Sequence, residues 1–432
     1  MDDEKASVRA TEPLDILALP LMAVLSYVSL VPYPFVRSVA VAGVPVLRLI
    51  PFGAGIAVTA ILAVRYFINR GRPVSHLYLA GMVLVFVGVE LLSAMGSVEP
   101  IKSITKVAFY TVTGVAFYFA AGGLNKRSAS AVLWTVVSMS FLVGAVSIIE
   151  FFTGRVPFYY RDYLQNNPYM PDPDLVGRSF STIGHPVFLG AFFILTIPAG
   201  YFLFQTGKKP YHKAAAILFA SVALAGLFFT FSRGAYLAAI VSAFVFFRRK
   251  INIKKAGVAV LVLALALAGL VAVSDKARDT LERRNPYRDY VQQFESAHRI
   301  KAFELTARVL GDVPILGMGI GNYRLLYEKY RAPGDDTRAV YATPDNMYLV
   351  TLAELGLLGI GLFVYILYSA SKAFKTGYGM GPDGAMLLMG LSMLAGFAID
   401  MFFFDALYVE PIRVVFWTLM GLACKDAGAE AL

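Results

Sequence analysis

Long apolar runs recur along the whole chain, and they constrain its fold more than any other feature. The hydrocarbon core of a bilayer is ~30 Å thick, so a helix that crosses it needs ~20 mostly apolar residues. Hydrophobic residues make up 58% of the chain and charged residues only 16%. That apolar share exceeds the usual share in soluble domains. The sequence therefore predicts an all-α integral membrane protein.

We expect about 12 transmembrane helices. The first apolar run is long and follows an N-terminus of mixed charge, which predicts a retained span rather than a cleaved signal peptide. The predicted spans lie at 14–32, 49–68, 75–94, 101–122, 128–152, 184–205, 212–231, 233–247, 254–273, 344–368, 382–403 and 409–424. The eighth span is short, and the last contains Arg413.

Alternate short loops are rich in Lys and Arg, as in "RYFINRGRPVS", "NKRS", "GKKPYHK" and "FRRKINIKK". Such loops stay in the cytoplasm, so both termini are expected inside. In a bacterial inner membrane, the remaining long segments would then face the periplasm. The predicted regions are a five-span region at 1–152, a periplasmic loop at 153–183, spans six to nine at 184–273, a large periplasmic loop at 274–343, and spans ten to twelve with a tail at 344–432.

A single cation separates two apolar runs at the outer ends of spans seven and eight. Arg233 lies there between Ser232, a candidate N-cap, and Gly234, which permits close backbone approach. An arginine beside a helix N-terminus suits a phosphate group. Arginines at span ends also reach toward lipid headgroups, and the residues alone leave both interpretations open.

The start of span ten carries a second polar group at the outer face. We expect Thr343 to cap this helix, Pro344 to be its first residue, and Asp345 and Asn346 to lie in its first turn. Glu354 would lie on the same face, about 12 Å deeper at 1.5 Å per residue. Asp345 is either a plain helix-terminal aspartate, favoured by the helix dipole, or a functional group.

Four stretches of the chain together resemble the O-antigen ligase and polymerase family. They are "GRSFSTIGHPVFLGAFF", "FSRGAYLAAIV", "PILGMGIGNY" and "TPDNMYLVTLAELGLLGIGLFVYIL". The resemblance implies transfer of a glycan from undecaprenyl diphosphate to an acceptor hydroxyl at the periplasmic face. The acceptor is the lipid A core for a ligase, or a carrier-linked repeat unit for a polymerase. No metal or other cofactor is expected.

The resemblance also implies roles for particular residues. Three arginines would bind the diphosphate: Arg178, Arg233 and Arg299. The family commonly has a His-Asn pair where this chain has Asp345 and Asn346. Asp345 would then be the catalytic base, and the outer histidines His185 and His298 are alternatives. Ser232, Asn346 and Glu354 would be supporting residues.

Two other functions remain open for a chain with this many spans, a lipid-linked glycan flippase and a secondary transporter. Transporters commonly show internal repeats and sites near the bilayer midplane, whereas the notable charges here gather at the outer ends of spans. The net charge is +10, and 12 Lys or Arg lie within 274–343. We expect this basic segment to attract diphosphate-linked substrate at the bilayer surface, and we expect no nucleic-acid partner.

Overall fold

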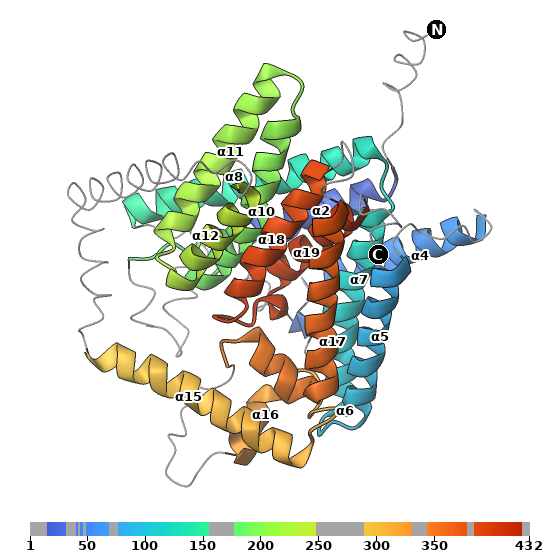
Figure 1. The fold of residues 1–432 in the computed structure, drawn as a ribbon, viewed down its shortest axis with the longest axis vertical. Helices are drawn as coiled ribbons and strands as arrows, with labels where there is room; N and C mark the ends of the chain where they lie inside the picture. Colours follow the sequence, from blue (N-terminus) through green and yellow to red (C-terminus); the bar gives the residue numbers. More distant parts are fainter. Residues whose placement is uncertain are drawn as a thin grey trace.

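The computed structural model of the chain describes residues 15–31, 40–41, 44–45, 49–68, 77–154, 177–247, 289–330, 344–377 and 384–425. This part is helical apart from an antiparallel pair of two-residue strands, Ala40–Val41 (β1) and Val44–Pro45 (β2). The described part of the chain is therefore helical, as predicted. Figure 1 shows the arrangement.

The helices follow the predicted spans closely. They are Ala18–Leu30 (α2), Leu49–Ile68 (α4), Leu77–Met95 (α5), Pro100–Lys106 (α6), the π-helix Val107–Val112 (η2), Thr113–Gly122 (α7), Lys126–Thr153 (α8), the 3-10 turn Ser181–Ile183 (η4), Pro186–Thr206 (α10), Pro210–Phe229 (α11), Arg233–Phe247 (α12), Asp289–Asp312 (α15), Tyr323–Tyr330 (α16), Met347–Gly377 (α17), Gly384–Asp400 (α18), the 3-10 turn Ala406–Tyr408 (η6) and Glu410–Lys425 (α19).

Within the described ranges, 5 helices are long and apolar enough to cross a membrane: Pro100–Gly122, Lys126–Thr153, Pro186–Thr206, Pro210–Phe229 and Met347–Thr376. Shorter apolar helices occupy five other predicted spans. The predicted span at 254–273 lies outside the described residues. The number of 12 spans and their orientation stay predictions.

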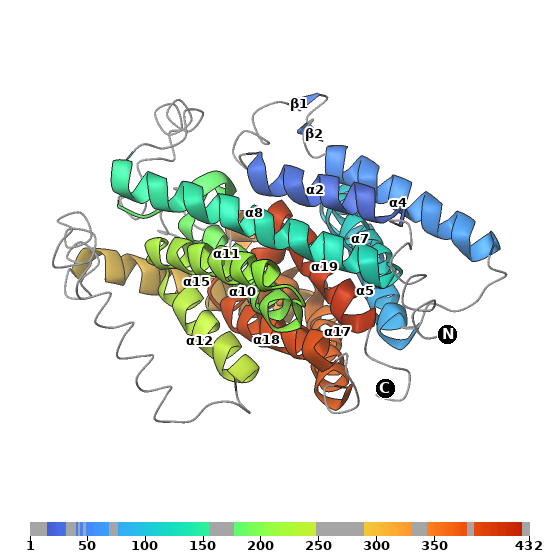
Figure 2. The same cartoon turned by 90° about the horizontal axis from the view of Figure 1, so that it is seen from above.

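The helices α10, α18 and α19 lie at the centre of the bundle in both views (Figures 1 and 2).

Small residues let the backbones of neighbouring helices approach closely, as is common between membrane helices. A Cβ on Gly144 of α8 would lie 2.8 Å from the Val222 carbonyl of α11. A Cβ on Gly421 of α19 would lie 2.2 Å from the Tyr118 carbonyl of α7. These contacts hold α8 and α19 against their neighbours.

The helix α17 is interrupted at Gly356, where φ is 66° and ψ is −166°. The break is filled by the stretch "PILGMGIGNY", which follows α15. The Leu357 N–H donates to the Pro314 carbonyl at 2.9 Å, and the Gly319 N–H donates to the Glu354 carbonyl at 2.9 Å. Span ten is therefore not the continuous helix that its apolar run predicts, because it meets another backbone at Gly356.

This docking places α15 and α16 at one end of the molecule, beside α6 and an end of α17 (Figure 1). The Asn322 amide reinforces it by donating to the Ser103 hydroxyl of α6 at 3.1 Å. The Lys106 ammonium donates to the Gly321 carbonyl at 3.0 Å. The part of the large predicted outer loop that the structure describes is thus fastened to the helix bundle.

The substitution Gly317→Ala is expected to destabilise the protein by roughly 2–4 kcal/mol. Gly317 has φ 65°, and a Cβ there would lie 2.5 Å from the Glu354 carbonyl carbon. Thermal unfolding of the purified protein in detergent measures the change. Gly311→Ala is the matched control, because a Cβ there meets nothing within 4 Å. Equal melting temperatures for both variants would contradict the docking.

The predicted orientation can be tested through the described part of the segment 274–343. After Cys424→Ser, we expect Ala307→Cys on α15 to react with a membrane-impermeant thiol reagent in intact spheroplasts, because Ala307 is exposed. Thr376→Cys, exposed at the predicted cytoplasmic end of α17, should react only after lysis. The reverse labelling pattern would refute the orientation.

Candidate active site

The structure brings two of the three predicted diphosphate-binding arginines onto neighbouring turns. Arg178 precedes α10, and its Nε donates to the Thr230 carbonyl at 2.7 Å. The next residue, Ser179, donates its N–H to the Phe229 carbonyl at 2.9 Å. Thr230 lies in the turn that leads to Arg233, the first residue of α12. Arg178 is buried and Arg233 is exposed. The hydrogen-bonded guanidinium of Arg178 therefore lies on a turn next to the turn that carries the exposed side chain of Arg233.

Ser232 caps α12 as predicted. Its hydroxyl accepts the Ala235 N–H at 3.5 Å, and its carbonyl accepts the Tyr236 N–H at 3.0 Å. At Gly234 the ring of Phe403 packs directly against the backbone, because a Cβ there would lie 2.7 Å from that ring. The first turn of α12 is therefore pressed against the segment that joins α18 to α19.

That segment, residues 401–409, is the point where several helices begin. The first turns of α10, α12 and α17 contact it, and α19 continues from it. The contacts are the rings of Phe188 and Phe404 (centroids 4.4 Å apart), Gly234 against Phe403, and the Met347 N–H donating to the Met401 carbonyl at 2.8 Å. Each helix N-terminus carries a partial positive charge, which favours an anion beside it, although three buried carboxyl groups, Asp400, Asp405 and Glu410, lie in or beside the same segment.

Backbone strain marks the same region. Within the described ranges, three residues other than glycine have positive φ: Ser181 (49°), Phe231 (48°) and Asp345 (47°). They lie in the Arg178 turn, in the Arg233 turn and at the start of α17, respectively. Such conformations persist where the surrounding structure enforces them, and they concentrate at functional sites.

The predicted position of Asp345 needs correction. We expected Asp345 and Asn346 inside the first turn of a helix capped by Thr343, with Pro344 as its first residue. Instead Asn346 is the cap, since its side-chain oxygen accepts the N–H groups of Tyr348 (2.9 Å) and Leu349 (3.1 Å). The helix begins at Met347. Asp345 precedes the cap in a left-handed conformation, which aspartate tolerates better than most residues, and Thr343 lies outside the described residues.

Glu354 is buried at the break in α17 and joins three parts of the chain. One carboxylate oxygen accepts the Tyr323 N–H at the start of α16, at 2.9 Å. The other accepts the Tyr408 hydroxyl from the segment 401–409. Burial, and then the charge of Glu354, raise the pKa of Tyr408 well above its ordinary value. Tyr408 therefore stays a neutral donor to the Glu354 carboxylate.

His185 also has a structural contact. Its Nδ1 accepts the Val187 N–H at 3.3 Å and so caps α10. In this geometry a neutral imidazole carries its proton on Nε2, and Nδ1 is occupied. The side chains of His298 and Arg299, on α15, lie outside what the structure describes. Across the described ranges, no three His, Cys, Asp or Glu side chains come together as a group that could hold a metal ion.

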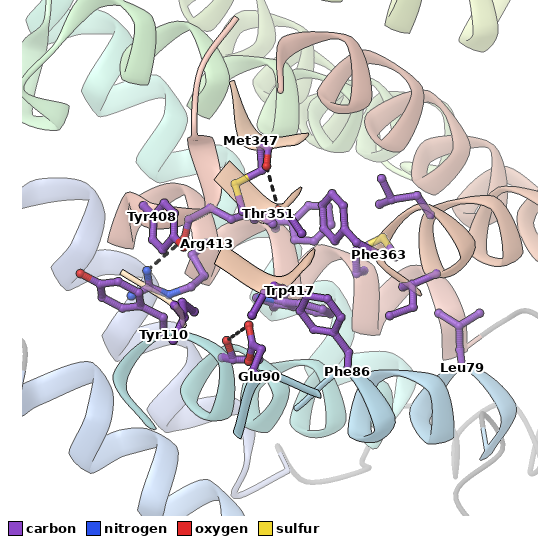
Figure 3. A pocket seen from close by; sticks show the side chains of 18 residues that line it. Leu79, Phe86, Glu90, Tyr110, Met347, Thr351, Phe363, Tyr408, Arg413 and Trp417 are labelled. Atoms are coloured by element: carbon purple, nitrogen blue, oxygen red, sulfur yellow. Dashed lines mark hydrogen bonds between the residues drawn. The ribbon is translucent and has the colours of Figure 1, made fainter. Parts of the chain in front are cut away.

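A buried polar cluster beside this end of the bundle was not predicted from the sequence. Glu90 of α5 accepts the Thr111 hydroxyl at 2.9 Å. Arg413 of α19 lies 4.4 Å from the Tyr110 ring centre and donates to the Leu407 carbonyl at 3.1 Å. Figure 3 shows Arg413 beside Tyr110 and Tyr408. These residues and Glu90 line a cavity of about 50 Å³. The cavity has room for a few water molecules.

Sequence signals for this cluster did exist. Glu90 and Arg413 each interrupt an apolar run, and ionisable residues within spans usually face a bundle interior. The π-helix Val107–Val112, which contains Tyr110 and Thr111, is visible only in the structure; such local irregularities are frequent at functional sites. No pattern in the sequence, however, indicates that these residues on three different helices meet.

Comparison with known proteins identifies the central part of the chain. No curated protein matches it. A model of the O-antigen ligase family matches residues 216–364, from α11 through the break in α17. This range includes Arg233, Arg299, Asp345 and Glu354, but neither Arg178 nor Glu90. The resemblance predicted from the sequence is thereby confirmed over residues 216–364, which match the O-antigen ligase family.

Proposed function

We propose that the protein transfers a glycan from undecaprenyl diphosphate to an acceptor hydroxyl at the periplasmic face of a bacterial inner membrane. It would act as an O-antigen ligase or polymerase. One observation carries this proposal: the turns that carry Arg178 and Arg233 are hydrogen-bonded to each other, at the end of the bundle where four helices begin. The family match supports glycan transfer of this kind.

The diphosphate would bind at the first turn of α12. Exposed Arg233 would contact two phosphate oxygens with its planar fork. Arg178, held by Thr230, would add a second positive charge at a fixed place. As the bond between the anomeric carbon and the diphosphate breaks, negative charge grows on the leaving oxygen. Guanidinium groups that are already oriented stabilise that charge, so we expect the reaction to need no metal ion.

The acceptor hydroxyl would approach from the side of Asp345. Its oxygen forms the new bond to the anomeric carbon, undecaprenyl diphosphate leaves, and the hydroxyl proton passes to the Asp345 carboxylate and then to water. Asn346 fixes the backbone next to Asp345 through its two cap hydrogen bonds. His185 and His298 remain alternative bases, although His185 would first have to release the Val187 N–H.

The segment that includes α15 and α16 would cover the carrier-linked donor at the bilayer surface. Arg299 of this segment would bind the diphosphate, and the other basic residues of the segment would attract anionic carriers. Glu354 would keep this segment on the bundle through the Tyr323 N–H and the Tyr408 hydroxyl. The partners are then the lipid bilayer, the carrier-linked donor, and either the lipid A core or a second carrier-linked unit.

Reconstitution tests the proposal against a flippase or a transporter. Purified protein would be placed in liposomes with carrier-linked glycan on one side and either lipid A core or no added acceptor. We expect a new glycan linkage: transfer to lipid A core identifies a ligase, and lengthening of the carrier-linked glycan identifies a polymerase. Movement of the unchanged carrier-linked glycan across the bilayer, with no new linkage, would overturn the proposal in favour of a flippase.

A further inference from the structure

Glu150 occupies a place where a carboxylate is not expected. It lies in the last turn of α8, and only 5% of its surface is exposed. A negative charge is disfavoured at a helix C-terminus by the helix dipole. It is also disfavoured by burial unless hydrogen bonds compensate. A carboxylate in this position therefore needs partners that the helix itself does not provide.

The partners come from the turn that carries Arg178. One oxygen of Glu150 accepts two backbone N–H groups, from Phe180 at 3.1 Å and from Ser181 at 2.8 Å. Ser181 has φ 49°, a conformation that residues with a side chain rarely adopt. The two adjacent donors can point to one oxygen in this backbone geometry. The strained turn and the buried carboxylate thus stabilise each other.

Two serine hydroxyls attach the same turn to α8. The Ser179 hydroxyl donates to the Ser147 carbonyl at 2.9 Å, and the Ser181 hydroxyl donates to the Val143 carbonyl at 2.8 Å. On its other side, the turn reaches the α11–α12 connection through Ser179 and Arg178. Glu150 is the ionisable group among these attachments to α8. It accepts the N–H of Phe180, which lies two residues after Arg178 in the chain.

We propose that Glu150 is a positioning residue for diphosphate binding. It holds the Phe180–Ser181 backbone, and through it keeps the Arg178 guanidinium beside the turn of Arg233. The inference rests on the proposed function, because it assigns Arg178 to the carrier diphosphate. Both Glu150 and Arg178 precede the segment matched by the family model, residues 216–364.

Binding of undecaprenyl diphosphate itself provides the test, since it needs no knowledge of the sugar. The full-length protein in lipid nanodiscs would be titrated with undecaprenyl diphosphate. Glu150→Ala is expected to weaken binding about tenfold or more, because two buried donors lose their acceptor and the turn can move. Glu150→Gln keeps an acceptor oxygen at the same reach and should bind nearly as well as the wild type. Glu150→Asp keeps the charge but is one methylene shorter, and should resemble Glu150→Ala.

A double-mutant cycle separates positioning from general stability. If Glu150 acts through Arg178, Glu150→Ala should add nothing to the loss caused by Arg178→Ala. Ser140→Ala is the matched control on α8, because it removes a buried hydrogen bond to Thr196 of α10 (2.7 Å) that does not involve the turn. It should leave the affinity for undecaprenyl diphosphate unchanged. Asp and Gln variants keep the test usable if Glu150→Ala does not fold.

The outcomes distinguish this inference from the proposed function. If Arg178→Ala weakens binding while Glu150→Ala and Glu150→Asp bind normally, the positioning role is wrong and the diphosphate site stands. Losses that multiply in the double variant would likewise overturn it. If the wild type does not bind undecaprenyl diphosphate, or Arg178→Ala has no effect, the proposed function fails and the inference fails with it.

Discussion

Replacing Arg233 with lysine should reduce glycan transfer about 10- to 100-fold, since a hydrogen bond to a charged group contributes about 1.5–3 kcal/mol. Lysine keeps the positive charge at the start of α12 but loses the planar fork that contacts two phosphate oxygens. Arg233→Ala should be only slightly worse. The measurement is the initial rate of transfer in liposomes, at equal amounts of folded protein.

The same substitution at Arg127 is the matched control. Arg127 is also an exposed arginine in the first turn of a helix, but it lies on the predicted cytoplasmic side. Arg127→Lys should transfer glycan at the wild-type rate. A residue that only reaches toward lipid headgroups tolerates lysine. Near-normal transfer by Arg233→Lys would therefore favour the headgroup interpretation and remove Arg233 from the diphosphate site.

The helices could be predicted well because apolar runs of the right length have few alternatives in a membrane. Span ten shows where this reasoning fails. Its leucine-rich run favours an uninterrupted helix, but Gly356 takes φ 66°. A Cβ there would lie 2.3 Å from the Ile315 carbonyl. The break depends on a contact with a distant stretch of chain, and helical periodicity carries no information about such contacts.

The candidate site was predictable residue by residue but not as an arrangement. Arg233 was conspicuous between two apolar runs, and Ser232 and Gly234 suited their observed roles. The hydrogen bond from Arg178 to the Thr230 carbonyl joins turns that are distant in sequence. Glu150 was missed for the same reason, since its partners belong to a turn that follows a different helix. Glu90 and Arg413 were visible as charges within apolar runs, but their meeting across α5 and α19 depends on packing.

Asp345 is the residue where the chain departs from the common pattern of the family that it resembles, and its backbone explains which replacements are informative. Its φ of 47° lies in the left-handed region. Asparagine, aspartate and histidine are the side-chain-bearing residues most enriched there. The family's histidine and this chain's aspartate therefore suit the same backbone. Asp345→Asn and Asp345→His should both fold normally, whereas alanine would add strain to any loss of chemistry.

Asp345→Asn is expected to lower the rate of transfer about 100-fold, within the range that general bases contribute. The amide keeps the size and backbone preference of aspartate but cannot accept the hydroxyl proton. Asp345→His should recover part of the rate, because imidazole can accept that proton. Its rate should fall as pH drops below the pKa of a histidine, about 6.5, since a protonated ring is no longer a base. Wild-type transfer by Asp345→Asn would exclude Asp345 as the base, and His185, His298 and Asp405, a buried carboxyl group of the segment 401–409, would be tested next.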